Sequence, residues 1–350
     1  NNGGALDGVT FKEGGTNFSN SLLVGTSSTG TLSSADGNTG VGTGVLGALT
    51  TGDNNVALGL NALDLNTTGG ANTAVGACAL LSNTTGVDNI AIGCCALHAN
   101  TDTSENVAIG NFALRSNDNT NSVAIGFKAL CANTTGANNT AVGTNSLDGN
   151  TTASDNTSLG KSSLGANTTG CENTAIGKDA MLANTTGIRN VAVGKGALKT
   201  NITGSSNVAI GREALGVATN NNNTSVGFDS MQATTTGADN TAVGMKALFT
   251  NTIGIGNTAI GTYALQANTT ACENTAVGYV ALSTNTTGTA NTAVGRGALQ
   301  VSTTGIYNTA TGYNSLAENT TASNNTAFGG EALKKTTTAS SNTAVGTSAL

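Results

Sequence analysis

The sequence predicts an all-β fold, a parallel β-solenoid (β-roll) of about 19–20 coils with one 17-residue repeat in each coil. The period of the repeat, the residues within it and the composition of the chain each support this prediction. A glycine that usually follows Val, Ile or Leu recurs every 17 residues, apart from two steps of 16, and such fixed self-similarity is typical of solenoids. The nineteen glycines are Gly42, Gly59, Gly76, Gly93, Gly110, Gly126, Gly143, Gly160, Gly177, Gly194, Gly211, Gly227, Gly244, Gly261, Gly278, Gly295, Gly312, Gly329 and Gly346.

A short β-strand is predicted just before each of these glycines. Asn stands four residues before the glycine in every copy except that of Ser122. The three positions between them hold, in order, a β-branched residue, a small residue and usually Val or Ile. Such residues favour strands. Because successive strand residues face opposite sides, the central Ala faces one way and its β-branched neighbours the other. Either face could point into the coil, so the orientation stays open at this stage.

The hydrophobic core is predicted to consist of one large side chain per coil, four residues after the glycine. This position holds Leu or Met, and nothing else in the repeat that is large enough to fill a coil recurs so regularly. The predicted core includes Leu63, Leu80, Leu97, Leu114, Leu130, Leu147, Met181, Leu198, Leu215, Met231 and Leu248.

The segment after the core residue, such as ANTTG at 132–136, is predicted to be a polar outward turn, because Asn and Gly both accept left-handed backbone. Both one-residue deletions fall in this segment, at 116–122 and 217–225, where a turn can absorb them without changing strand register. Helical solenoids are excluded because 17 residues cannot hold two helices. Stacking at about 4.8 Å per coil predicts a rod on the order of 90 Å long, with Asn, Thr and Leu ladders and with Asn amides bonded from coil to coil.

Two segments divide the chain. Residues 1–35 form an N-terminal segment with degenerate coils, and residues 36–350 form the repeat array, which is truncated within a repeat at Leu350. We therefore expect the chain to be a processed or truncated piece of a longer protein.

One face of the strands is expected to contact other copies of the chain. Only one face can look into its own coil, and the other would be a continuous apolar strip that exceeds what a soluble monomer usually exposes. A homotrimer or filament would bury this strip. The predicted interchain residues are Val107, Ile109, Val123, Ile125, Val142, Val208 and Ile210.

Composition and charge exclude several partners. Charged residues are 9% of the chain and the net charge is −6, so there is no basic stripe of the kind that nucleic acid requires. No run of about 18 apolar residues exists, which argues against membrane insertion. Acids recur before the Asn, and bases, among them Lys178 and Lys195, recur after the Gly. Solvated charges that keep the solenoid soluble are the favoured interpretation, and pairing across subunits is the alternative.

Few residues could carry chemistry, and no catalytic, cofactor-binding or metal-binding residue is predicted. His98 is the only histidine, so neither a Ser/His/Asp triad nor a His-rich metal site has the partners it needs. Cys78 and Cys95 occupy the same position in adjacent coils, and either a disulfide or a pair of free stacked thiols fits that spacing. The sequence NTT also matches the N-glycosylation sequon, as at Asn133, Asn167 and Asn184.

The repeats resemble known families. NSVAIG at 121–126, with the related NVAIG and NTAVG, resembles the head repeats of YadA-type trimeric autotransporter adhesins, which form parallel β-rolls in intertwined trimers. The longer form NTAVGxxALxxNTTGxx is similar to arrays in fibre proteins of marine phages and related surface proteins, and residues 12–42 resemble the start of such arrays. The 17-residue coil is longer than that of adhesin heads, which favours the fibre interpretation.

Two functional hypotheses follow from these observations. The first is a structural, non-enzymatic fibre or filament, an extracellular, cell-surface or virion rod that holds an adhesive tip and reaches a cell-surface receptor through regions outside this chain. The second is an ice-binding or surface-adhesion β-solenoid that uses Asn and Thr ladders, with the NTT segment supplying the Thr row. A pectin-lyase-like enzyme is disfavoured because no clustered carboxylates or bases appear.

Overall fold

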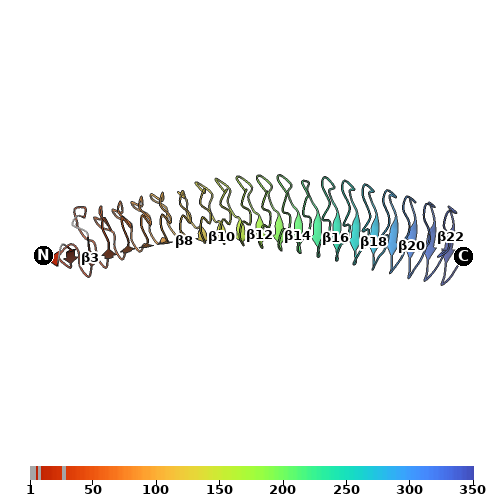
Figure 1. Ribbon diagram of the computed structural model, residues 1–350, viewed down its shortest axis with the longest axis horizontal. Helices are drawn as coiled ribbons and strands as arrows, with labels where there is room; N and C mark the ends of the chain where they lie inside the picture. Colours follow the sequence, from red (N-terminus) through yellow and green to blue (C-terminus); the bar gives the residue numbers. More distant parts are fainter. Residues whose placement is uncertain (1–4, 7–8, 26–28) are drawn as a thin grey trace. The chain divides into compact units, whose positions relative to one another are not determined.

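The computed structural model describes residues 5–6, 9–25 and 29–350. Contacts divide the chain into two compact units, Asn1–Glu172 and Asn173–Leu350. Both units are parallel β-solenoids, with about 19 turns in all and no helix within the described ranges. The predicted fold class is confirmed, and in each unit the coils follow one another in chain order (Figure 1).

Nearly every coil contributes one three-residue strand, placed just before the glycine as predicted. The first unit contains β1 (Ala5–Leu6), β2 (Val9–Glu13), β3 (Leu22–Val24), β4 (Thr39–Val41), β5 (Val56–Leu58), β6 (Thr73–Val75), β7 (Ile90–Ile92), β8 (Val107–Ile109), β9 (Val123–Ile125), β10 (Thr140–Val142) and β11 (Thr157–Leu159). The second contains β12 (Thr174–Ile176), β13 (Val191–Val193), β14 (Val208–Ile210), β15 (Thr224–Val226), β16 (Thr241–Val243), β17 (Thr258–Ile260), β18 (Thr275–Val277), β19 (Thr292–Val294), β20 (Thr309–Thr311), β21 (Thr326–Phe328) and β22 (Thr343–Val345).

The strands pair in register from coil to coil. The first three form antiparallel pairs, β1 with β2 and β2 with β3. From β3 onward each strand pairs in parallel with its successor inside the same unit, so that Ala141, for example, lies opposite Ser158. The two 16-residue steps leave this register intact, because Val107 still pairs with Val123 and Val208 with Thr224. The deletions are therefore absorbed in the turns.

The structure answers which strand face points inward. The central strand residue, usually Ala, is buried in every coil from β4 to β22, whereas its two neighbours are half-exposed or exposed. Inside the coil this Ala meets the small residue and the core residue that follow the glycine, which leaves no room for a second large side chain. All of the core residues named from the sequence are fully buried, including Met181 and Met231.

The recurring glycine is required by how closely the coils stack. Gly143 has a φ of 131°, and a Cβ added to it would lie 2.6 Å from the carbonyl oxygen of Gly160 in the next coil. A side chain there would collide with backbone, which cannot move aside without separating the coils. The glycine that marks the repeat in the sequence thus lies at a point of close backbone contact between coils.

Asparagine side chains form two buried ladders. One of them lies in the segment predicted to be an outward turn, and for its Asn that prediction is wrong. Asn133, the first residue of an NTT segment, is fully buried and donates to Asn117 Oδ1 (2.7 Å) and to the carbonyl oxygen of Gly136 (2.8 Å). At the other ladder, just before the strands, Asn240 Oδ1 accepts from the backbone N–H of Asn257 (2.9 Å). The turn Asn therefore points inward because neighbouring coils satisfy its amide, and only the two Thr of the segment lie outside.

Candidate functional site

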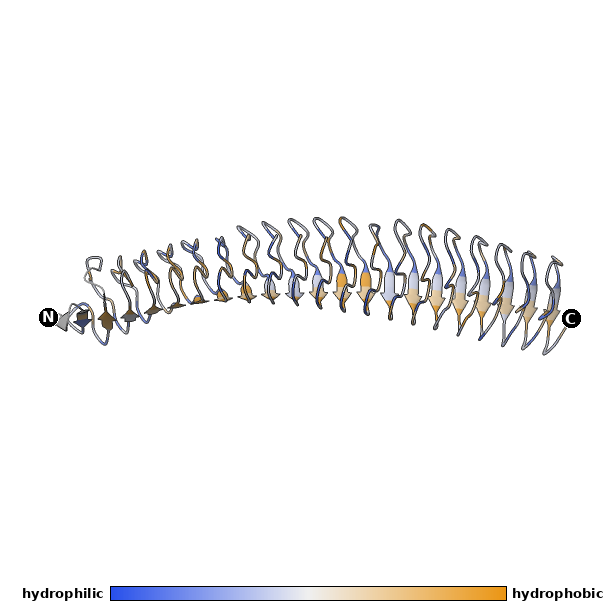
Figure 2. Cartoon of the chain, in the orientation of Figure 1, coloured by the Kyte–Doolittle hydropathy of each residue, from blue (hydrophilic) through white to orange (hydrophobic). Residues whose placement is uncertain are grey.

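The outward face of the strands is the most extensive candidate surface. It carries the first and third residue of each strand, and Ile90 and Ile92 of β7, for example, are each 38% exposed. Figure 2 shows β13 and β14 as strongly hydrophobic strands, in agreement with their sequences VAV and VAI. This surface, the strand face, runs without interruption along each unit. The interchain residues named from the sequence all lie on it, half-exposed or exposed: Val107, Ile109, Val123, Ile125, Val142, Val208 and Ile210.

The chemistry of the strand face changes along the second unit. From β15 to β22 the first residue of every strand is Thr, so eight consecutive coils present a row of outward Thr beside a row that is mostly Val or Ile. The NTT segments do not offer such a row, because the hydroxyl of their first Thr is already engaged. Thr134 Oγ1, for example, donates to the carbonyl oxygen of Thr151 (2.9 Å). At this position the Thr hydroxyls of the turn therefore donate within the solenoid, and only their oxygens can still accept a hydrogen bond.

A second surface lies beside the strand face and is chemically more varied. It consists of the residues one, two and five positions after each recurring glycine, and we call it the variable edge. Exposed rings and cations gather there: the guanidinium of Arg296 lies 5.8 Å from the ring centre of Tyr279 and 5.7 Å from that of Tyr313. Because its residues differ from coil to coil, this edge is where the repeat can carry local sites.

The variable edge of the second unit contains a cleft with three lysines. The cleft has a volume of about 340 Å³, and its lining includes Lys178, Asp179, Lys195, Lys199, Glu213 and Gln232. Backbone bonds stack its coils, since the N–H of Gly196 donates to Lys178 O (3.0 Å) and that of Glu213 to Lys195 O (3.0 Å). We call this the lysine cleft. Lys178 and Lys195 belong to the bases that recur directly after the glycine, and this recurrence does not predict a cleft.

A second cleft of about 380 Å³ lies on the variable edge of the first unit. It is lined by Phe112, Arg115, Lys128, Cys131, Ala132 and Asp148. Here the cations are engaged with aromatic rings, because Arg115 lies over Phe112 (5.8 Å) and Lys128 over Phe127 (5.5 Å). Burial raises the pKa of the Asp148 carboxyl, an effect that its own backbone N–H and Lys128 oppose. Both clefts therefore carry one more cation than acid, but the cations of this cleft lie over aromatic rings.

The histidine and the six cysteines are half-buried. Burial, and then the charge of Arg115, lower the pKa of His98. Cys78 and Cys95 are both free thiols, and Cys95 Sγ lies 3.6 Å from Cys94 Sγ. Burial, the hydrogen bond with Cys94 and the neighbouring thiols raise the pKa of Cys95 to about 11. Across the described ranges, no three His, Cys, Asp or Glu side chains are placed to hold a metal ion together.

The sequons do not present accessible amides. Asn133, Asn167 and Asn184 are fully buried, and the side-chain amide of each donates inside its coil, to Gly136, Gly170 and Gly187 respectively. A sugar on any of these residues would require the ladder to open.

The class of this protein is defined by its fold, because the comparisons with protein families and curated proteins found no match. No protein-family model matches the chain, and no curated protein matches it. Within the described ranges there is no helix with the length and apolar character needed to cross a membrane. Fold and ladders together define a β-solenoid repeat protein with coils of about 17 residues and buried Asn and Ser ladders.

Proposed function

We propose that this chain is a structural, non-enzymatic β-solenoid that assembles with copies of itself, as a homotrimer or filament, into a stiff extracellular, cell-surface or virion fibre. The observation that carries the proposal is the strand face, an uninterrupted surface of Val, Ile and Thr along each unit. Exposed apolar surface of this extent usually marks an interface. The resemblance of the repeats to adhesin heads and phage fibres supports the same assignment.

A second copy of the chain is the occupant that best suits the strand face. The face repeats once per coil, at about 4.8 Å, and a partner must repeat at the same interval to make equivalent contacts along its whole length. Another copy of this solenoid has the same interval because its coils are identical to those of the first copy. Closed homo-oligomers, moreover, are the common outcome when a chain offers the same surface in every copy.

The mechanical role follows from how the coils are held together. Backbone bonds, two Asn ladders and one core residue per coil stack each coil on the next, so that stiffness does not depend on any single residue. Burial of the strand face between copies would add further stiffness. A rod of this kind could carry an adhesive tip, which would contact a receptor through regions outside this chain.

The proposal can be tested by introducing charged side chains on the strand face. The double substitution Ile90→Lys with Ile92→Lys places two cations on β7, and we expect it to reduce the assembled fraction in sedimentation experiments. The matched control is Thr85→Lys with Val87→Lys, which adds the same charge in the same coil but outside the strand; Val87 is 38% exposed, as are Ile90 and Ile92. Equal assembly of both variants would contradict the proposal.

Ice binding remains a second candidate because of one specific observation, the eight consecutive outward Thr of β15 to β22. A regular row of hydroxyl and methyl groups at the coil spacing could order water. Thermal hysteresis at micromolar protein would favour this function over the fibre. Substitution of Thr258 and Thr275 by Lys should then abolish the hysteresis, whereas Lys at Thr85 should not.

A further inference from the structure

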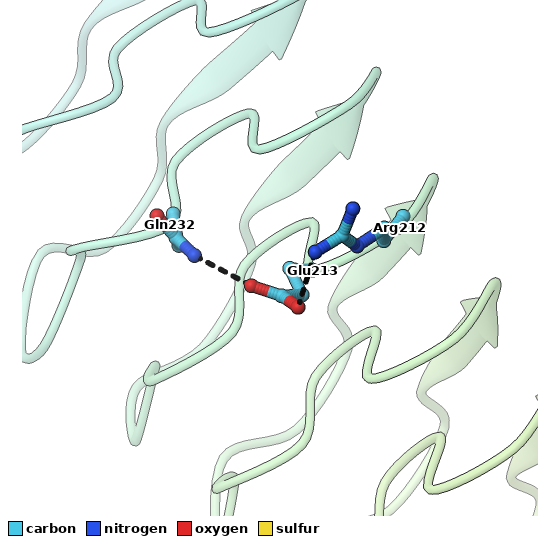
Figure 3. A network of polar contacts seen from close by, with 3 residues as sticks. All are labelled: Arg212, Glu213 and Gln232. Carbon is cyan, nitrogen blue, oxygen red and sulfur yellow. Dashed lines mark hydrogen bonds and ion pairs between the residues drawn. The ribbon is translucent and has the colours of Figure 1, made fainter.

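The lysine cleft of the second unit has an excess of positive charge that its own acids do not balance. Asp179 is engaged by Lys178, with Oδ2 lying 3.7 Å from Nζ. Glu213 is held on both oxygens, since Arg212 Nη2 donates to Oε1 (3.3 Å) and Gln232 Nε2 to Oε2 (2.8 Å), as Figure 3 shows.

Two lysines of the cleft are left without an acid. Among the described residues, neither Lys195 nor Lys199 has a carboxylate within 4.0 Å. Both belong to one coil and line the same cleft. Two ammonium groups offer up to six N–H donors and no acceptor, which matches a ligand group with several negatively charged oxygens.

Two glycines open the space between these lysines and the next coil. Gly196 and Gly216 occupy variable-edge positions at which other coils carry larger side chains, such as Asn145 and Gln232. A Cβ on Gly196 would approach Glu213 Cγ at 3.5 Å, so a longer side chain there would extend into the cleft. The cleft volume of about 340 Å³ exceeds that of an inorganic ion and falls within the range of small-molecule sites.

The walls of the cleft also suit a hydroxylated ligand. Gln232 and Glu213 line the cleft together with Thr200, whose hydroxyl donates to the carbonyl oxygen of Gly216 (3.1 Å) and can still accept through its oxygen. We propose that the lysine cleft binds a sulfate or phosphate monoester of a sugar, with Lys195 and Lys199 on the ester oxygens and the polar wall on the sugar hydroxyls.

Calorimetric titration of the full chain tests this proposal. The probes are glucose 6-sulfate, glucose 6-phosphate, inorganic phosphate and glucose, all at the same ionic strength. We expect saturable binding of at least one sugar ester, weaker binding of inorganic phosphate and none of glucose, and an affinity that falls as NaCl is added. If neither ester binds, or if glucose binds equally well, the proposal is wrong.

Variants drawn from the chain's own repeats locate the site while keeping the fold. Lys195→Thr and Lys199→Gln introduce residues found at the same positions in other coils, such as Thr262 and Gln266, and each should weaken ester binding by about tenfold. Lys246→Asn removes the same charge elsewhere on the variable edge and should change nothing. A loss of affinity as large in the Lys246 variant would show non-specific charge attraction and overturn the assignment.

A substitution that leaves the charge of the cleft unchanged tests whether ester binding also needs the open space of the cleft. Gly196→Asn fills the cleft, and the left-handed backbone there (φ 66°) accepts Asn, as the φ of 52° at Asn145 in the equivalent position demonstrates. We expect this variant to lose ester binding while its circular dichroism spectrum stays that of the unmodified chain. Unchanged affinity would place any binding outside the cleft.

Discussion

The buried Asn ladder beside the strands gives a quantitative prediction. Asn240 joins three coils. Its Oδ1 accepts from the backbone N–H (2.9 Å) and from Nδ2 (3.1 Å) of Asn257, and its Nδ2 donates to the carbonyl oxygen of Gly254 (2.8 Å) and to Asn223 Oδ1 (3.2 Å). Asn240→Ala removes all four contacts. The oxygen of Gly254 keeps a second donor, Asn251 Nδ2 (3.1 Å), but the N–H of Asn257 has no other acceptor among the described residues.

The expected cost follows from these contacts. A buried N–H left without a partner costs about 1–3 kcal/mol, and each further lost hydrogen bond about 0.5–1.5 kcal/mol. Because one buried N–H loses its acceptor and three further hydrogen bonds are lost, the free energy of opening for these coils should fall by at least about 2 kcal/mol. At about 1.4 kcal/mol per factor of ten, this corresponds to amide exchange at least about 30-fold faster.

Hydrogen exchange followed by mass spectrometry is the appropriate assay, because long repeat arrays do not unfold in a single step and a local readout is needed. Peptides covering β16 and β17 should show the acceleration. Thr236→Ala changes an exposed residue of the same coil and should leave exchange nearly unchanged. If Asn240→Ala accelerates exchange no more than this control does, the ladder does not stabilise the coils as argued.

Three further predictions follow from the coil. Leu248→Ala should lower the free energy of opening of its coil by about 2–5 kcal/mol, whereas Leu248→Met should lower it by less than about 1.5 kcal/mol, both measured by hydrogen exchange of the peptides that cover this coil. Gly244→Ala should disrupt folding because its Cβ would lie 2.6 Å from the carbonyl carbon of Gly261, whereas Gly330→Ala, with no atom within 4 Å, should be soluble and folded. Cys95, whose pKa is raised to about 11, should be alkylated slowly at pH 8, and its rate should rise about tenfold per pH unit up to pH ~11; a rate that levels off near pH 9 would contradict this.

The period, the strand position and the core residue could all be predicted from sequence because each reflects a local requirement repeated in every coil. The orientation of the strand could not, since both of its faces are apolar. The orientation depends on volume, because the central position, which faces the core Leu, holds a small residue such as Ala or Ser in the regular coils. The turn Asn was predicted to lie outside because local propensity does not register that an amide such as that of Asn133 is satisfied by neighbouring coils.

The lysine cleft was not predicted from the sequence, for a different reason. Two of its lysines, Lys178 and Lys195, belong to the bases that recur directly after the glycine, whereas Lys199 does not. The recurrence of a base from coil to coil does not predict whether there is open space beside it. The informative signal was the absence of side chains, Gly196 in one coil and Gly216 in the next, at positions where other coils carry larger residues. Coil-by-coil comparison of the variable edge could have found this pair.

The native mass of the unmodified chain tests most directly whether the strand face is an interface between copies. We predict that native mass spectrometry at micromolar concentration gives three or more times the chain mass of 34.0 kDa, with imaging revealing rods or filaments. A single species at 34.0 kDa that persists at high protein concentration would contradict self-assembly and leave the strand face exposed to solvent.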